Sequence, residues 1–262
     1  MQPDRARPAE IEPWTNRVFI HRFSVALLPV ATRTGLSPNA ISVAGLLCGL
    51  GAAFAYVHWR DPLMATFGLV LMIAWHICDG LDGKLARATG KSSDFGRLLD
   101  GVCDYATFVV VYLALALTSD IPAATVPLAL LAGAAHALTS LHYEAERSLF
   151  IARANSGGTE IHPAASIERG YIDLQERATR GSATFDTTAT ASARQQYVRE
   201  AAPMLKLLSF ESANTRTILI WLTALAGAPW LFWVIELTVL PLLSVLVARR
   251  LRALEKRLIT AA

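Results

Sequence analysis

The sequence has few charged residues. Asp, Glu, Lys and Arg make up 17% of its 262 residues, whereas hydrophobic residues make up 53%. Its mean hydropathy is +0.40. Because soluble domains carry about 25% charged residues, this composition argues against an ordinary soluble domain and favours a membrane protein with several spans. The net charge of +3 is small and says little by itself, and no nucleic-acid partner is expected.

Cysteine is also scarce. The three cysteines, Cys48, Cys78 and Cys103, all fall in apolar segments, so no disulfide framework is indicated and each is interpreted as a small core residue. The first 23 residues are polar and lack the apolar core of a signal peptide. We therefore expect no cleavage there.

Six apolar stretches are long enough to cross a bilayer, for which about 20 residues are needed. The sequence thus predicts an all-α polytopic membrane protein with six transmembrane helices, at about 38–59, 63–85, 98–117, 121–141, 215–228 and 229–247. Before them, residues 21–34 mix apolar residues with Arg22 and Arg33, which predicts an N-terminal interfacial amphipathic helix. A helix packed on the protein's own surface is the alternative.

This pattern divides the chain into four parts. They are a polar N-terminal segment (1–20), the interfacial helix with the first four spans (21–152), a cytoplasmic insert (153–203), and the last two spans with a basic tail (204–262). Within the insert, Tyr197, Val198, Ala201 and Leu205 keep a helical interval, while the Ser/Thr/Ala-rich run 181–192 is expected to be flexible. The insert is either a loop without a role or a contributor to an acceptor site or a protein contact.

The basic residues predict the orientation. Of 24 Lys and Arg residues, only Arg60 falls on the side of the proposed spans opposite to all the others. Because cytoplasmic loops carry an excess of Lys and Arg, both termini and the loop between the second and third spans are expected in the cytoplasm. The expected location is the bacterial inner membrane.

Four aspartates stand at helical spacing where the second span ends and the third begins. Asp79 and Asp82 are three residues apart, and Asp100 and Asp104 are four apart, so each pair shares one helix face. Small residues continue those faces and leave room for close approach of a ligand or a backbone. Four facing carboxylates would repel unless cations lie between them. Oxygen-only ligation points to magnesium or manganese, with calcium as the other choice.

The run Asp79-x-x-Asp82-Gly83-x-x-Ala86-Arg87, followed after eight residues by Gly96-x-x-x-Asp100-x-x-x-Asp104, resembles the signature of the CDP-alcohol phosphotransferases at every fixed position. The resemblance covers the first three spans well. It implies a transferase that displaces CMP from a CDP-linked alcohol, with a pair of divalent ions at Asp79, Asp82 and Asp100. It also implies that Asp104 is the general base and contacts the second metal. A homodimer is implied as well.

Further residues are expected at the nucleotide. Arg87 has the forked geometry that pairs with diphosphate oxygens, while Gly80, Gly83 and Ala86 leave room against the helix. Asn39 belongs to a Ser37-Pro38-Asn39 element that resembles the start of the family's first conserved helix. A serine N-cap followed by proline explains the same tripeptide without a ligand.

Other polar residues have two interpretations each. His76, three residues before Asp79, is either a partner of a carboxylate or a histidine satisfied in the core. The cluster His142–Arg147 is either an acceptor site or an interfacial belt of internal ion pairs. Glu236 is an acid inside the sixth span whose partner the sequence does not identify.

The resemblance leaves two reactions open. In one, CDP-diacylglycerol gives its phosphatidyl group to a small polar alcohol, and the compact six-span core favours this branch. In the other, CDP-choline or CDP-ethanolamine gives its head group to a lipid alcohol. A cation or proton transporter is the alternative from another class, but the aspartates cluster at span ends and no inverted repeat is visible.

Overall fold

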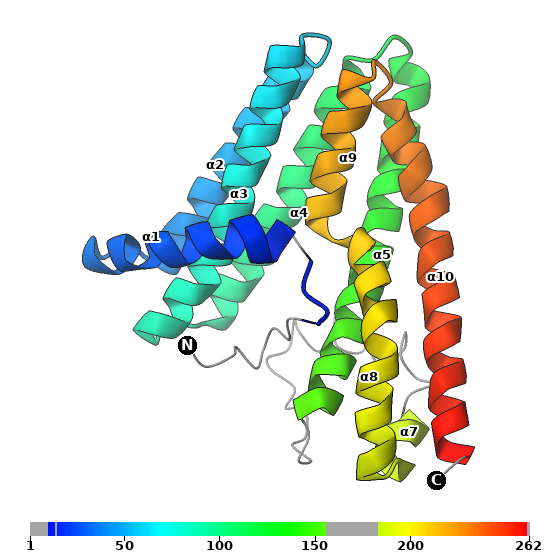
Figure 1. The fold of residues 1–262 in the computed structure, drawn as a ribbon. Coiled ribbons are helices and arrows are strands. Elements are labelled where there is room, and N and C mark those ends of the chain that lie inside the picture. Colours follow the sequence, from blue (N-terminus) through cyan, green and yellow to red (C-terminus); the bar gives the residue numbers. More distant parts are fainter. Residues whose placement is uncertain (1–9, 14, 156–182, 261–262) are drawn as a thin grey trace. The chain divides into compact units, whose positions relative to one another are not determined.

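The computed structural model describes residues 10–13, 15–155 and 183–260. These residues form helices joined by turns, with no strand among them (Figure 1). The prediction of an all-α fold is therefore confirmed. In chain order the elements are η1 (Asn16–Ile20), α1 (His21–Arg33), α2 (Pro38–Val57), α3 (Pro62–Thr89), α4 (Asp94–Leu117), α5 (Pro122–Asn155), α7 (Ala183–Thr188), α8 (Ala191–Leu208), η2 (Ser209–Glu211), α9 (Ala213–Leu225) and α10 (Trp230–Thr260).

Five helices are long and apolar enough to cross a membrane: α2, α3, α4, α5 and α10. They cover five of the six predicted spans. The remaining span, predicted at 215–228, corresponds to α9, which has 13 residues. At 1.5 Å per residue α9 is about 20 Å long, shorter than a hydrocarbon core of about 30 Å. The presence of six transmembrane helices therefore stays a prediction.

Short polar residues set the starts of the helices that carry the aspartates and of the helix beside them. The side chains of Ser37, Asp61 and Ser93 accept hydrogen bonds from the first-turn backbone N–H groups of α2, α3 and α4, respectively. This confirms the predicted cap at Ser37. Helix α3 ends at Thr89 and is capped by Gly90, whose φ of 66° is the left-handed conformation that glycine adopts without a side-chain clash.

The chain forms two compact units. Of the described residues, one unit, here called the aspartate unit, comprises 15–135 and 213–237. The other, the network unit, comprises 10–13, 136–155, 183–212 and 238–260. The long helices α5 and α10 contribute residues to both. Each unit has its own apolar core.

In the aspartate unit, α2 packs against α3 and α4, and α3 also contacts α1 and α9. Gly49 allows the close approach of α2 to α4, because a Cβ at this position would lie 2.5 Å from the Thr107 hydroxyl oxygen. The predicted helix near the N-terminus is α1, which lies across α3 (Figure 1). Its Ser24 and Ala31 are buried, while Phe23, Leu27 and Val30 are exposed. That the exposed face lies on a membrane stays a prediction.

In the network unit, α8 confirms the helical interval read in the insert. Tyr197, Ala201 and Leu205 are all buried in the core. The expectation that 181–192 is flexible is contradicted where the run is helical, because residues 183–188 form α7 and residues 191–192 begin α8. Phe185 explains the difference, since its buried ring packs 5.3 Å from the Tyr197 ring and anchors α7. Residues 156–182 lie outside the described part of the chain.

Candidate metal and nucleotide site

Three of the four aspartates converge. Asp79 and Asp82 on α3 and Asp100 on α4 each offer a carboxylate oxygen, and these three atoms lie within 4.8 Å of one another. The convergence follows from the spacing, because positions three apart share a helix face and α2 holds both aspartate helices. Among the described residues, these three aspartates are the group of Asp, Glu, His or Cys side chains whose ligand atoms lie close enough together to hold one metal ion. Its donors are all oxygen, which suits a hard divalent cation.

Asp82 is the most deeply buried of the three. Its Oδ2 accepts a hydrogen bond of 2.6 Å from the Ser42 hydroxyl, and its Oδ1 accepts one of 2.5 Å from the backbone N–H of Gly83. A buried carboxylate needs such donors, because an unpaired charge in an apolar environment is costly. The contact with Ser42 was not anticipated from the sequence.

Asp104 lies one helical turn beyond Asp100 on α4, outside the group of three converging oxygens. It remains close enough for the charges of Asp79, Asp100 and Asp82 to act on it. The structure therefore separates Asp104 from the three prospective ligands without removing it from the site.

A cavity of about 240 Å³ opens beside these carboxylates. It brings together four of the five residues expected at the nucleotide: Asn39, Gly83, Ala86 and Arg87. The cavity wall combines acids with cations, and its lining residues are Pro38, Asn39, Ser42, Asp82, Gly83, Ala86, Arg87, Lys91, Ser92, Ser93, Gly96, Arg97 and Asp100. The wall therefore places carboxylates that could bind a divalent cation next to Lys and Arg side chains that could bind an anionic ligand.

Gly80, the fifth expected residue, is placed differently. It is absent from the cavity wall and faces α1 and the end of η1, where an added Cβ would lie 2.8 Å from the Ser24 hydroxyl oxygen and 3.2 Å from the Ile20 Cγ2. The absence of a side chain at Gly80 therefore allows the N-terminal helical segment, and not a ligand, to pack closely against α3. Gly83 differs, since the nearest atom to a Cβ there is the Arg87 Nη1 at 3.4 Å, the end of a flexible side chain.

Two polar side chains on α3 near the site, those of His76 and Lys84, have partners within the fold. The ring Nε2 of His76 lies 3.0 Å from the Thr217 hydroxyl of α9, so His76 is a buried core histidine. The ammonium of Lys84 donates to the carbonyl of Gly80 on its own helix at 2.7 Å. Lys91, by contrast, lines the cavity.

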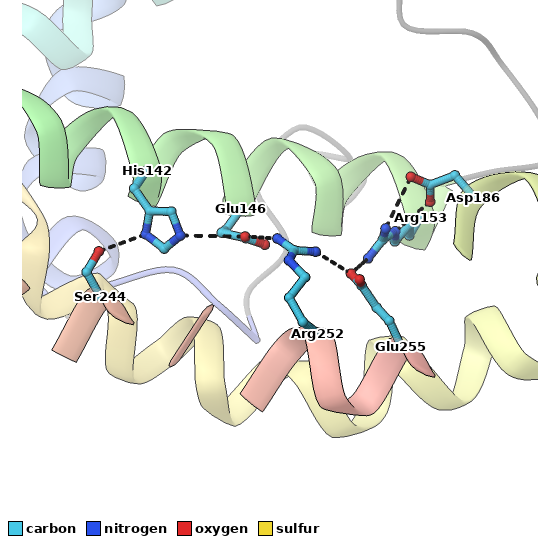
Figure 2. A network of polar contacts seen from close by, with 7 residues as sticks. All are labelled: His142, Glu146, Arg153, Asp186, Ser244, Arg252 and Glu255. Carbon is cyan, nitrogen blue, oxygen red and sulfur yellow. Dashed lines mark hydrogen bonds and ion pairs between the residues drawn. The ribbon is translucent and has the colours of Figure 1, made fainter. Parts of the chain in front are cut away.

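The cluster at 142–147 belongs to the network unit, and ion pairs occupy its charges. The His142 Nδ1 lies 2.8 Å from the Ser244 hydroxyl, and Glu146 pairs with Arg252. Figure 2 shows the chain of contacts continuing from Arg252 through Glu255 to Arg153 and Asp186. This favours the internal ion pairs over an acceptor site as the role of the cluster.

Arg153 forms the end of this network. Its guanidinium donates to Asp186 at 2.7 and 3.1 Å and to Glu255 at 2.7 Å, and it lies over the rings of Phe185 and Tyr197. Burial raises the pKa of Tyr197 to about 12, so its hydroxyl stays protonated beside these charges. The guanidinium thus fastens α7 to α5 and α10.

The fold and the site define a class: a helical membrane protein with three carboxylates that could hold a divalent cation and an adjoining cavity lined in part by Lys and Arg side chains. The chain belongs to the CDP-alcohol phosphatidyltransferase family, whose model matches residues 35–167, about half of the sequence. That range includes all four aspartates, and the resemblance found in the motif is confirmed.

Individual relatives match over shorter stretches. The chain is 39% identical over 70 residues to archaetidylinositol phosphate synthase of Pyrococcus horikoshii, covering 27% of this chain and 35% of the relative. It is 36% identical over 73 residues to CDP-diacylglycerol–glycerol-3-phosphate 3-phosphatidyltransferase of Cereibacter sphaeroides, covering 28% and 33%. The match thus spans about a third of each of these relatives.

A solved structure is also similar, namely phosphatidylinositol phosphate synthase of Mycobacterium tuberculosis with CDP-DAG bound. The sequence identity is 17%, the TM-score is 0.40, and the match covers 89% of this chain and 94% of the other.

Proposed function

We propose that this protein transfers a phosphatidyl group from CDP-diacylglycerol to a small polar alcohol and releases CMP. The observation that carries the proposal is the convergence of Asp79, Asp82 and Asp100 beside a cavity that contains Arg87 and Lys91. Carboxylates and cations on one wall suit a diphosphate that binds together with a divalent ion. The name of the Cereibacter sphaeroides relative, CDP-diacylglycerol–glycerol-3-phosphate 3-phosphatidyltransferase, favours the CDP-diacylglycerol branch.

The donor set of Asp79, Asp82 and Asp100 fits a magnesium or manganese ion, and in this proposal Asp104 would help to hold a second ion. When bound, divalent cations would neutralise the diphosphate and stabilise charge on the phosphoryl group in transfer. No described side chain in the group offers nitrogen or sulfur, so softer metals have no preferred ligand there.

The chain's own residues supply the remaining steps. The acceptor hydroxyl oxygen forms a bond to the phosphorus that carries the diacylglycerol, while the bond from this phosphorus to the CMP oxygen breaks. Asp104 takes the hydroxyl proton, because it lies beside the three ligands without being one of the convergent oxygens. Arg87 binds the diphosphate oxygens through its guanidinium, and Gly83 and Ala86 leave space for the nucleotide. Asn39 contacts the nucleotide from α2.

We place the site on the cytoplasmic side of a bacterial inner membrane, because 23 of the 24 basic residues fall on that side of the proposed spans. The partners in this proposal are the CDP-linked lipid, the small alcohol and the surrounding membrane lipids, with a second copy of the chain as a homodimer partner.

The test is CMP release by the purified protein, supplied with CDP-diacylglycerol and a panel that includes inositol phosphate, glycerol phosphate and serine. CMP release that requires one of these alcohols supports the proposal. Release only from CDP-choline or CDP-ethanolamine with diacylglycerol moves the protein to the other branch. Cation flux into sealed vesicles without CMP release from any CDP-linked substrate would indicate a transporter.

A further inference from the structure

One contact at the candidate site comes from a helix that carries none of the aspartates. The hydroxyl of Ser42 on α2 donates to the Asp82 Oδ2 on α3 at 2.6 Å. Both residues are buried, with 6% of Ser42 and 4% of Asp82 exposed. The other acceptor near this hydroxyl is the carbonyl of Pro38 at 3.3 Å. Because the contact with the carboxylate is shorter and charge-assisted, the Ser42 hydroxyl donates its hydrogen bond to Asp82 in preference to the Pro38 carbonyl.

The first turn of α2 holds Ser42 in place. Ser37 caps this turn by accepting from the N–H of Ala40 at 3.1 Å, and Pro38 fixes the first helical position. Asn39, in the same turn, lies against Gly96 of α4, since a Cβ on Gly96 would meet the Asn39 Oδ1 at 3.2 Å. The start of α2 therefore touches both helices that carry the aspartates.

The two oxygens of Asp82 are held from different directions. Oδ1 accepts from the N–H of Gly83 on its own helix, whereas Oδ2 accepts from Ser42 across the helix interface. Together these donors fix the rotation of the carboxylate. Each carboxylate oxygen has a further lone pair, so both hydrogen bonds are compatible with cation binding.

We propose that Ser42 is a positioning residue, which orients the Asp82 carboxylate for divalent-cation binding. The proposal rests on the proposed function, in which Asp82 is a metal ligand. Partners that orient a ligand contribute strongly, and their removal lowers metal affinity by about 10–100-fold. Ser42 acts through Asp82 and has no part in the proton transfer assigned to Asp104.

The test is calorimetric titration of Mn²⁺ into the purified protein without any CDP-linked substrate. In Ser42→Ala, Mn²⁺ affinity should fall by about 10–100-fold, because the carboxylate loses its donor from α2. Ser42→Thr keeps the hydroxyl and should bind Mn²⁺ nearly as tightly as the wild type. Thr89→Ala is the matched control, since the Thr89 hydroxyl donates to the Leu85 carbonyl of its own helix at 2.7 Å.

A second measurement separates positioning from a general effect on folding. At saturating Mn²⁺, CMP release by Ser42→Ala should recover most of the lost rate, because excess cation compensates for weaker binding. Equal Mn²⁺ affinity in Ser42→Ala and the wild type would overturn the role of Ser42 and leave the proposed function standing. A different outcome is that Ser42→Ala loses tight Mn²⁺ binding while the wild type itself releases no CMP. That outcome would overturn the proposed transferase function and leave the role of Ser42 in cation binding standing. Should Ser42→Ala fail to fold, weak Mn²⁺ binding by a folded Ser42→Thr also counts against the proposal.

Discussion

Arg216 on α9 and Glu236 on α10 form a bidentate ion pair inside the aspartate unit. The guanidinium Nε donates to both carboxylate oxygens at 3.1 and 3.0 Å, and Nη2 donates to Oε1 at 2.9 Å. Both side chains are fully buried. The intramembrane acid that the sequence left without a partner is therefore neutralised by an arginine 20 residues earlier in the chain.

Breaking this pair should destabilise the protein strongly. Glu236→Gln keeps the shape but removes the carboxylate charge that faces the buried Arg216 guanidinium, which costs about 3–5 kcal/mol. The double variant Arg216→Met with Glu236→Leu should lose less, because both charges of the pair are removed together. Equilibrium unfolding in detergent measures both.

The exposed pair Arg60–Asp120 provides the control for this measurement. Its side chains are 51% and 86% exposed, so Asp120→Asn should cost no more than about 1 kcal/mol. If Glu236→Gln were as stable as Asp120→Asn, the buried pair would have no special weight and its position in the core would need another explanation.

The two ends of the proposed spans should differ in their access to reagents. Ser192 on α8 and Asp120 between α4 and α5 are both exposed. A membrane-impermeant thiol reagent added to intact cells should label Asp120→Cys and leave Ser192→Cys unlabelled until the membrane is opened, because basic residues predict a cytoplasmic insert. The wild type gives the background from Cys48, Cys78 and Cys103. Labelling of Ser192→Cys in intact cells would reverse the orientation.

Short-range sequence features predicted that Asp79, Asp82 and Asp100 converge, while the roles of these aspartates and of Asp104 stay predictions. A helix repeats every 3.6 residues, so spacings of three and four were enough to place Asp79 with Asp82, and the two aspartates of α4 with each other. The cap at Ser37 was equally predictable, because it involves a hydroxyl and an N–H three residues apart. Such features depend on local geometry alone.

Contacts between distant parts of the chain were not predictable. Ser42 and Asp82 are 40 residues apart, and their hydrogen bond depends on how α2 packs on α3. The neighbour of Gly80 was equally hidden, because an absent side chain marks close approach but not whether a ligand or α1 fills the space. A single serine inside an apolar span, one turn after a capped start, is the signal that could have drawn attention to Ser42.

Removal of divalent cations should abolish CMP release. The group of Asp79, Asp82 and Asp100 has only oxygen donors, so magnesium or manganese should restore activity after chelation with EDTA. Calcium should bind but restore less, because its longer and more flexible coordination fits a compact three-carboxylate group less well. CMP release that continued unchanged in excess EDTA would contradict a metal-dependent transfer.

The four aspartates should separate into two functional groups. In Asp104→Asn, metal and CDP-lipid binding should persist while turnover falls by about 10²–10⁴, the usual contribution of a positioned general base. In Asp79→Asn or Asp100→Asn, metal binding itself should weaken, because each change removes a charged ligand from the convergent group. Calorimetric titration of metal and CDP-lipid, beside CMP release, measures both effects.

Asparagine keeps the shape of aspartate and one acceptor oxygen, so helix packing should survive in all three variants, and equal unfolding midpoints would verify this. The position of Asp104, outside the three oxygens that lie within 4.8 Å of one another, is the physical reason for expecting a difference. If Asp104→Asn and Asp79→Asn lost equal metal affinity, Asp104 would be a ligand first. The proton of the acceptor hydroxyl would then need another base, because the remaining aspartates would all be committed to cations.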